Sequence, residues 1–132
     1  MEFKVKPLVP GDAEGVIAIV NKYISFLGDI DLDSGALSGY GPLKGKILIF
    51  PGSRGSTVGP YVIYGLSKKS LAPNAMIVKD LDPLLIAGCV ISSIPLALAN
   101  DWSNLINYVE KHCNGRECLG KLLSNSRVLI IE

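Results

Sequence analysis

The sequence predicts an α/β domain, built either as a β/α sandwich or as a mixed barrel, with helices on one side of the sheet. Two observations lead to this fold class. Short apolar runs alternate with segments of helical periodicity in the middle of the chain, whereas strand-like segments dominate its beginning. The length of 132 residues, without an internal repeat or a low-complexity linker, fits one domain over residues 1–132 with a substantial core.

The expected strands are short, and most of them are apolar. Residues 3–8 alternate, with Lys4 and Lys6 on one face, which is typical of a half-buried strand. Residues 46–50, Lys-Ile-Leu-Ile-Phe, are almost continuously apolar, as expected for a central strand that is buried on both faces. The remaining expected strands are residues 15–20, 75–78, 95–98 and 127–131.

Three helices are expected, at residues 58–69, 83–92 and 103–112. Pro60 fits the first turn of the first helix, where a backbone N–H has no helical partner. Asp82 followed by Pro83 is typical of an N-cap and a first helical position. Ser103 is the expected cap of the third helix. Residues 25–40 hold three glycines and three aspartates and are expected to form a long, turn-rich loop.

Charge is balanced, with 13 basic and 12 acidic residues, which argues against nucleic-acid binding driven by phosphate neutralisation. The charged fraction of 19% and the mean hydropathy of +0.37 are unusual for a lone soluble domain. Either part of the surface is buried against a partner or the domain is simply small and well packed, and composition does not separate the two. The longest apolar run, residues 84–99, is shorter than the ~20 residues of a membrane-spanning helix. Residues 1–6 lack the apolar core of a signal peptide.

The three cysteines, Cys89, Cys113 and Cys118, are an odd number at irregular spacing, which predicts no disulfide framework and a reducing cytoplasm. His112 together with Cys113 and Cys118 suggests metal ligands. A tetrahedral site usually takes a second pair of ligands, however, and the chain has one histidine. We therefore expect no metal site made by this chain alone, and we expect Cys89, which lies in an apolar run, to be a core residue.

The most informative segment is the loop from Phe50 to Gly59, Phe-Pro-Gly-Ser-Arg-Gly-Ser-Thr-Val-Gly, between an expected strand and an expected helix. Backbone N–H groups, the positive end of a helix dipole, hydroxyls and the Arg54 guanidinium converge there. Such a point suits an anion, or a hydroxyl that must lose its proton. The alternative is an ordinary strand-to-helix turn in which Ser or Thr caps the helix.

Two familiar phosphate-binding loops do not match this segment. A P-loop is excluded because counting from Gly52 places Thr57 where the second glycine should be, with no lysine after it. The glycine spacing also differs from that of the dinucleotide-binding fingerprint.

Several short blocks between residues 11 and 98 carry a resemblance to a known family. They are Ala13-Glu14-Gly15, Ile24-Ser25-Phe26-Leu27-Gly28, Asp33-Ser34-Gly35, Gly45-Lys46-Ile47-Leu48-Ile49-Phe50-Pro51, Gly55-Ser56-Thr57-Val58-Gly59, Tyr61-Val62-Ile63-Tyr64, Ala72-Pro73, Ala87-Gly88 and Ile94-Pro95. In this order they resemble the aconitase X swivel-domain family, and in particular the small subunits of archaeal dehydratases. Pro60 departs from the family pattern, which has a small polar residue there.

The resemblance implies a swivelling β/β/α domain that is similar to the mobile domain of aconitase. It implies activity only together with a large subunit, which carries a [4Fe-4S] cluster, while this chain itself binds no cofactor. The implied reaction dehydrates (R)-5-phosphomevalonate to trans-anhydromevalonate 5-phosphate in the archaeal mevalonate pathway to isoprenoids. Two alternatives are dehydration of another hydroxy acid, such as a hydroxyproline, and a non-catalytic module that binds a phosphorylated metabolite.

The resemblance also assigns roles within the loop. In the family, the serine of the Gly-Ser-Thr-Val-Gly block accepts the proton, and the matching residue here is Ser56. A serine alkoxide is costly in water, and a helix N-terminus, loop N–H groups and Arg54 would lower that cost. Arg54 alternatively holds the carboxylate or the phosphate of the substrate. Ser53, Gly55 and Thr57 are expected to line the substrate site, with Ser53 and Thr57 positioning the loop.

Overall fold

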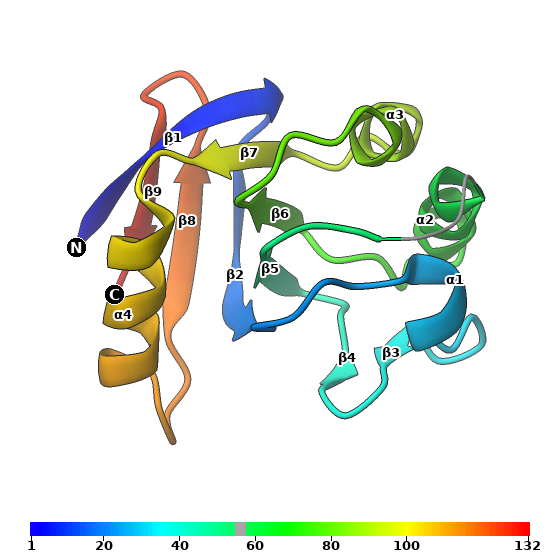
Figure 1. Ribbon diagram of the computed structural model, residues 1–132, viewed down its shortest axis with the longest axis horizontal. Coiled ribbons are helices and arrows are strands. Elements are labelled where there is room, and N and C mark those ends of the chain that lie inside the picture. The colour runs from blue at the N-terminus through cyan, green and yellow to red at the C-terminus, as the bar shows by residue number, and fades with distance from the viewer. Residues whose placement is uncertain (55–57) are drawn as a thin grey trace.

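The computed structural model describes residues 1–54 and 58–132 (Figure 1). The helices are α1 (Phe26–Asp29), α2 (Gly59–Lys68), α3 (Pro83–Ser92) and α4 (Trp102–His112). The strands are β1 (Glu2–Val9), β2 (Ala13–Ile19), β3 (Ala36–Leu37), β4 (Gly41–Pro42), β5 (Lys46–Phe50), β6 (Ala75–Val78), β7 (Leu96–Ala99), β8 (Leu119–Leu123) and β9 (Val128–Ile131). All expected helices and strands appear, with ends shifted by no more than two residues.

Seven of these strands form a closed barrel in the order β1-β7-β6-β5-β2-β8-β9, and β9 pairs with β1 to close it. Strands β2, β5, β6 and β7 run parallel, whereas β8, β9 and β1 pair in antiparallel fashion. The prediction of a mixed barrel is thus confirmed. Because parallel strands end at the same edge, the segments that follow β2, β5, β6 and β7 gather at one edge of the barrel.

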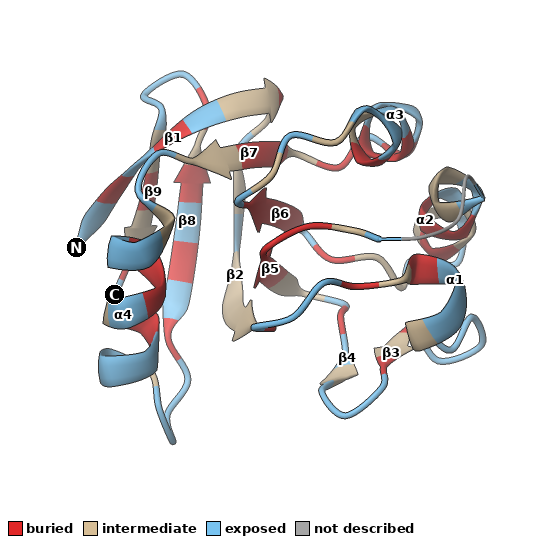
Figure 2. Ribbon diagram, viewed as in Figure 1, coloured by how far each residue is buried: buried red, intermediate tan, exposed pale blue. Residues whose placement is uncertain are grey.

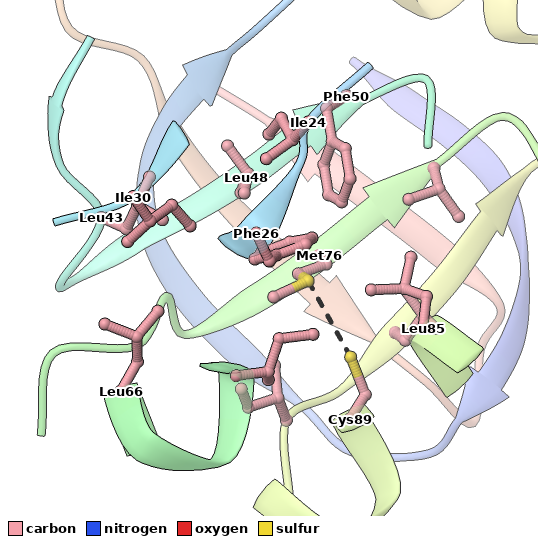
Figure 3. Close-up of a cluster of buried hydrophobic side chains, with 14 of the residues drawn as sticks. Ile24, Phe26, Ile30, Leu43, Leu48, Phe50, Leu66, Met76, Leu85 and Cys89 are labelled. Atoms are coloured by element: carbon pink, nitrogen blue, oxygen red, sulfur yellow. Dashed lines mark hydrogen bonds between the residues drawn. The ribbon is translucent and has the colours of Figure 1, made fainter. Parts of the chain in front are cut away.

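Residues of the parallel strands alternate between two hydrophobic clusters, one on each face. The first cluster takes Leu48, Phe50, Met76 and Val78 from the strands, and α1, α2 and α3 cover it (Figure 3). Within it the Cys89 thiol points at the Met76 sulfur, 3.9 Å away. Strand β6 is buried along its whole length, and β5 is buried after its first residue (Figure 2). The continuous apolarity of these strands is therefore explained by cover on both faces.

The second cluster lies on the other face of the same strands. It contains Ile47, Ile49, Ala75, Ile77 and Ala97, together with residues of β1, β8 and β9 and with Leu105, Ile106 and Val109 of α4. Helix α4 accordingly lies on the side opposite α2 and α3 (Figure 1). The expectation that helices cover only one side is wrong, because α4 buries its apolar face on this second cluster.

The start of α4 and the strand β8 differ from the sequence prediction. The cap of α4 is Asp101, whose carboxylate accepts a hydrogen bond from the Asn104 N–H at 3.1 Å, so Ser103 is not the cap. Strand β8 was not expected because its buried positions include Gly120 while Leu119 is exposed, which hides the alternation. A Cβ at position 120 would lie 2.3 Å from Ile17 Cδ1, so this position favours glycine.

Cys113 and Cys118 form a disulfide, with their Cα atoms 5.6 Å apart. The expectation that the cysteines are unpaired is therefore wrong for these two. The chain reverses between α4 and β8, with Gly115 in the left-handed region at φ 76°, and this reversal brings the two thiols together. Cys89 is free and buried, as expected, and burial raises the pKa of its thiol to about 12.

The expected loop over residues 25–40 contains one turn of helix, α1. Ser25 caps it by accepting a hydrogen bond from the Gly28 N–H at 3.3 Å. Phe26 is buried in the first cluster and its ring meets the Phe50 ring edge to face, with centroids 6.0 Å apart. The prediction of a turn-rich loop is thus wrong for residues 26–29, which the buried Phe26 anchors to the core, and for Ala36–Leu37, which form the short strand β3.

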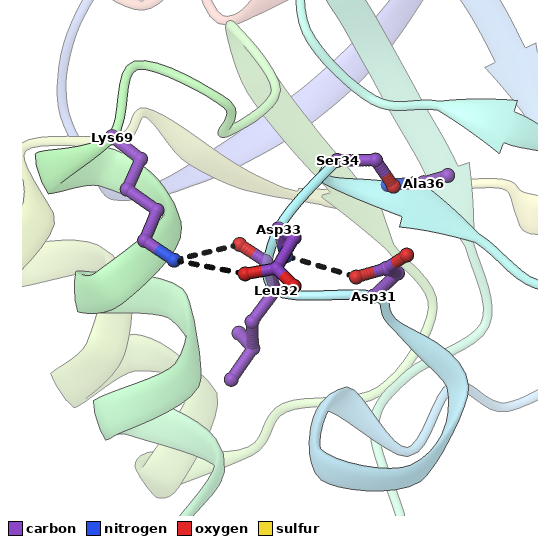
Figure 4. A network of polar contacts seen from close by, with 6 residues as sticks. All are labelled: Asp31, Leu32, Asp33, Ser34, Ala36 and Lys69. Atoms are coloured by element: carbon purple, nitrogen blue, oxygen red, sulfur yellow. Dashed lines mark hydrogen bonds and ion pairs between the residues drawn. The ribbon is translucent and has the colours of Figure 1, made fainter.

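The acidic part of the same loop is fastened to the end of α2 (Figure 4). The Asp33 N–H donates to the Asp31 carboxylate at 2.9 Å, and this hydrogen bond holds the pKa of Asp31 below its usual value. The Lys69 ammonium donates to the Leu32 carbonyl at 3.0 Å and lies 3.8 Å from the Asp33 carboxylate. Both charged groups of that ion pair are exposed, so it adds little stability.

Candidate functional site

The candidate site lies where β5 and β6 end, next to the first turns of α2 and α3 (Figure 1). Ser53 and Arg54 follow β5, and Asp82 lies between β6 and α3. A pocket of about 60 Å³ opens between these segments. It is lined by Phe26, Leu27, Ser53, Arg54, Gly59, Pro60, Ile63, Asp82, Leu84 and Leu85. The pocket is thus lined by residues of the expected loop, of α1 and of the first turns of α2 and α3.

Asp82 links the loop to the start of α3. One carboxylate oxygen accepts hydrogen bonds from the Leu84 N–H at 2.9 Å and the Leu85 N–H at 3.4 Å, which makes Asp82 the expected N-cap. Its other oxygen accepts a hydrogen bond from the Ser53 hydroxyl at 2.5 Å. This contact links Ser53 to the residue that caps α3.

The backbone of the loop is held from both sides. The Gly52 carbonyl accepts from the Ile24 N–H, and the Arg54 N–H donates to the Ile24 carbonyl, both at 3.0 Å. On the other side, the Pro51 carbonyl accepts from the N–H groups of Lys79 and Asp80, at 3.1 and 3.0 Å. The segment from Pro51 to Arg54 is therefore part of a hydrogen-bonded frame.

A side-chain hydrogen bond spans this frame. The Tyr23 hydroxyl donates to the Asp80 carboxylate, and this hydrogen bond raises the pKa of Tyr23 above its usual value. The Tyr23 ring lies over Gly52, where an added Cβ would come within 3.1 Å of a ring carbon. Gly52 therefore permits the ring to pack against the loop.

Arg54 is exposed and forms no ion pair with another described residue. Its guanidinium is thus available to an anion at the pocket. The other expected site residues, Gly55, Ser56 and Thr57, lie outside the described residues. At the far end of the loop, Pro60 lies in the first turn of α2 as expected, and the N-cap residue of α2 is Val58 rather than a serine or threonine.

Metal-ligating groups are sparse in the described part of the chain. Residues 1–54 and 58–132 contain no cluster of three or more His, Cys, Asp or Glu side chains that could hold a metal ion. Cys113 and Cys118, which the sequence offered as ligands, are bonded to one another. No helix in these same residues is both long enough and apolar enough to cross a membrane.

Sequence reasoning found Asp82 only as a helix cap and missed its bond to Ser53. The order of the strands could have predicted this contact, because residues that follow neighbouring parallel strands meet at one edge of the sheet. Tyr23 and Ile24, which follow β2, and Asp80, which follows β6, share that edge. No sequence pattern predicted that Phe26 and Leu27 line the pocket, since their position depends on the short helix α1.

The fold and the site define an α/β protein built on a mixed barrel, with a loop that carries Ser53 and Arg54 between the end of β5 and the start of α2. The family model described as the aconitase X swivel domain matches residues 2–114. The chain belongs to this family, so the resemblance and the fold class expected from the sequence are confirmed.

Similar proteins are found among archaea. The chain is 42% identical over 96 residues to the phosphomevalonate dehydratase small subunit of Aeropyrum pernix, covering 73% of this chain and 72% of the relative. It is 38% identical over 122 residues to the protein of the same name from Pyrococcus abyssi, covering 88% and 94%.

Two solved structures share the fold over the whole chain. The crystal structure of Thermococcus kodakaraensis aconitase X in its holo-form matches with a TM-score of 0.84 and 32% identity, covering 100% of this chain and 98% of the matched one. The solution NMR structure of a UPF0107 protein matches with a TM-score of 0.81 and 30% identity, covering 100% and 99%. The likeness therefore includes the segment after residue 100, which lay outside the blocks recognised in the sequence.

Proposed function

We propose that this chain is the small subunit of a phosphomevalonate dehydratase, a hydro-lyase of the archaeal mevalonate pathway. The observation that carries the proposal is its relation to proteins of that name, at 37 to 44% identity over most of the chain. The enzyme removes water from (R)-5-phosphomevalonate to give trans-anhydromevalonate 5-phosphate. Residues 1–132 act as one swivel domain that closes over a large subunit.

The reaction needs a base for the proton next to the carboxylate and an acid for the hydroxyl that leaves the neighbouring carbon. An iron–sulfur cluster in the large subunit supplies the Lewis acid. This chain supplies the base and part of the anion-binding surface.

We assign the base to Ser56. Two features of the described residues on either side of it support this role. On one side, hydrogen bonds hold the chain up to Arg54. Helix α2 begins at Gly59, and the positive end of a helix stabilises an anion near its first turn.

Arg54 serves the same site, and two roles are compatible with its exposed guanidinium. It stabilises the serine alkoxide, or it holds the carboxylate or phosphate of the substrate through its planar fork. Gly55 and Thr57 complete the loop around the substrate, while Ser53 holds the loop to Asp82.

The decisive experiment is a dehydratase assay on this chain purified anaerobically in complex with the large subunit from the same organism. With (R)-5-phosphomevalonate, we expect turnover that requires both chains. Ser56→Ala should lower kcat by about 100-fold or more, as is usual on loss of a general base. Ser126→Ala, at an exposed serine in the β8–β9 turn, is the matched control and should leave kcat unchanged.

The other functions make different predictions in the same experiment. Turnover of a hydroxyproline but not of phosphomevalonate by an intact complex would reassign the substrate. Tight binding of phosphomevalonate by this chain alone would favour a non-catalytic module, because half of an enzyme site should bind its substrate weakly. Near-normal turnover by Ser56→Ala would reject the serine base.

A further inference from the structure

Large apolar side chains are exposed on the side of the molecule that carries α2 and α3. We define the α2–α3 face by six of them: Tyr61, Tyr64, Leu81, Leu84, Val90 and Ile91. Four of these side chains are more than half exposed, from 54% at Ile91 to 74% at Tyr61. Helices α2 and α3 pack side by side and away from α4 (Figure 1), and the six residues belong to these two helices or to the segment that leads into α3.

Helix α3 is apolar all round. Leu85 and Cys89 face the first cluster and are buried, while Leu84, Val90 and Ile91 are exposed. No residue between Pro83 and Ser92 carries a charge. A helix of this kind normally lies inside a protein, and at ten residues it is too short to cross a membrane. Its exposed side therefore indicates an interface with another protein.

Helix α2 extends the same surface and adds one charge at its end. Its residues Val62, Ile63 and Leu66 are buried against the first cluster, and Tyr61 and Tyr64 are exposed. The one charged residue of α2, Lys68, lies in its last turn, where its ammonium is over the Tyr64 ring, 5.3 Å from the ring centroid. The face accordingly offers apolar and aromatic contacts, which are typical of the core of a protein interface.

The α2–α3 face is continuous with the candidate site. Leu84 belongs to both, since it lines the pocket beside Ser53 and Arg54 while remaining 42% exposed. Leu81 immediately precedes Asp82, which holds Ser53. A chain that completes the site at Arg54 would therefore border this face.

We propose that the α2–α3 face is the docking surface for the large subunit, which covers it with an uncharged apolar surface of its own. This inference rests on the proposed function, because that function requires a second chain at the site. It explains why a domain of 132 residues has only 19% charged residues and a positive mean hydropathy. Without charges on α3, assembly should depend little on salt.

The test measures assembly rather than activity. Ile91→Lys, in the complex with the large subunit from the same organism, places an ammonium at the interface, remote from the pocket lining. We expect its dissociation constant to rise by about tenfold or more, because an unpaired charge is costly to bury. Leu119→Lys is the matched control, since Leu119 is 57% exposed on β8, and it should change the constant less than twofold.

Folding is checked separately on the full chain. Lysine has a better helix propensity than isoleucine, so the thermal midpoint of Ile91→Lys should match that of the unaltered chain. A second variant, Val90→Ala, keeps the helix and removes apolar contact area, and it should weaken assembly in the same direction by a smaller factor. If neither substitution weakens the complex, the docking proposal is wrong.

The remaining outcomes separate this proposal from the proposed function. If Ile91→Lys blocks assembly but the unaltered complex does not dehydrate phosphomevalonate, the docking surface stands and the substrate assignment fails. If the complex is active and Ile91→Lys assembles normally, the function stands and the docking surface is rejected. If the chain instead forms a homodimer that Ile91→Lys disrupts, the face is occupied by a second copy and the proposal is overturned.

Discussion

Helices α3 and α4 both cover the barrel, yet their outer surfaces differ. Helix α4 is amphipathic, with Leu105 and Val109 buried and Glu110 and Lys111 exposed to water. Helix α3 exposes Val90 and Ile91 instead. The outer side of α4 carries charged residues, as is usual for a surface in water. The outer side of α3, which borders the candidate site, is apolar, as is usual for a surface that binds a partner. Both helices cover the core, and the docking proposal gives α3 a second role, in assembly.

The largest expected difference between the α3 side and the α4 side is the effect on kcat/KM of replacing an arginine on each. Arg54→Lys at the site should lower kcat/KM by about 100-fold, because an ammonium does not reproduce the planar fork of a guanidinium. Arg116→Lys, at an exposed position between α4 and β8, should leave kcat/KM unchanged. Steady-state kinetics of the complex checks both. A rise in KM alone would assign Arg54 to substrate binding, and a fall in kcat alone would assign it to the anion formed in the reaction. Equal kinetics for the two variants would contradict any role of Arg54.

The next contrast uses two helix caps of the same chemistry. Asp82→Ala and Asp101→Ala should each lower the free energy of unfolding by about 1 to 2 kcal/mol, since each carboxylate caps a helix. Only Asp82→Ala should also lower kcat/KM, by about tenfold, because Ser53 loses its acceptor. Chemical denaturation and kinetics of the complex test this pair. Unchanged kinetics for Asp82→Ala would mean that the Ser53–Asp82 bond is purely structural.

The smallest effect is a pH dependence on the α3 side. Burial raises the pKa of Cys89 from 9.0 to about 12, so between these values the unfolded chain loses a proton that the folded chain keeps. The folded state then binds more protons, and the free energy of unfolding should fall as pH rises through this range, by at most about 1.4 kcal/mol per pH unit. Below pH 9 the contribution is fully present. Cys89→Ala should flatten this slope relative to the unaltered chain in denaturation series from pH 8 to 10. Equal slopes would show that the thiol is accessible to water.

Much of this fold could be predicted from the sequence, because the central strands are buried on both faces and are continuously apolar. Asp82-Pro83 and Pro60 located two helix starts for equally local reasons. Strand β8 could not be found, since its buried Gly120 is required by the approach of Ile17 across the barrel, a contact between distant segments. The disulfide was missed for the same kind of reason, because the reversal at Gly115 sets the distance between Cys113 and Cys118.

The roles given to the site residues stay predictions, and the structure adds where two of these residues lie. Ser53 and Arg54 were identified from the loop composition, and the structure places both at the pocket. The bond from Ser53 to Asp82 joins residues 29 positions apart, and the frame around Gly52 depends on Ile24 and Asp80. Such contacts follow from the parallel order of β2, β5 and β6, which no local pattern reveals.

The pairing of β1 with β9 has a consequence for synthesis on the ribosome. The barrel closes only when residues near the start of the chain meet residues 128–131, so closure must wait until almost all of the chain has emerged. Residues 13–99, which hold the parallel strands and helices α1 to α3, leave the ribosome earlier. During that interval the apolar side of α3 and the unpaired edge of β2 are exposed together, and such surfaces make a partly synthesised chain prone to aggregation.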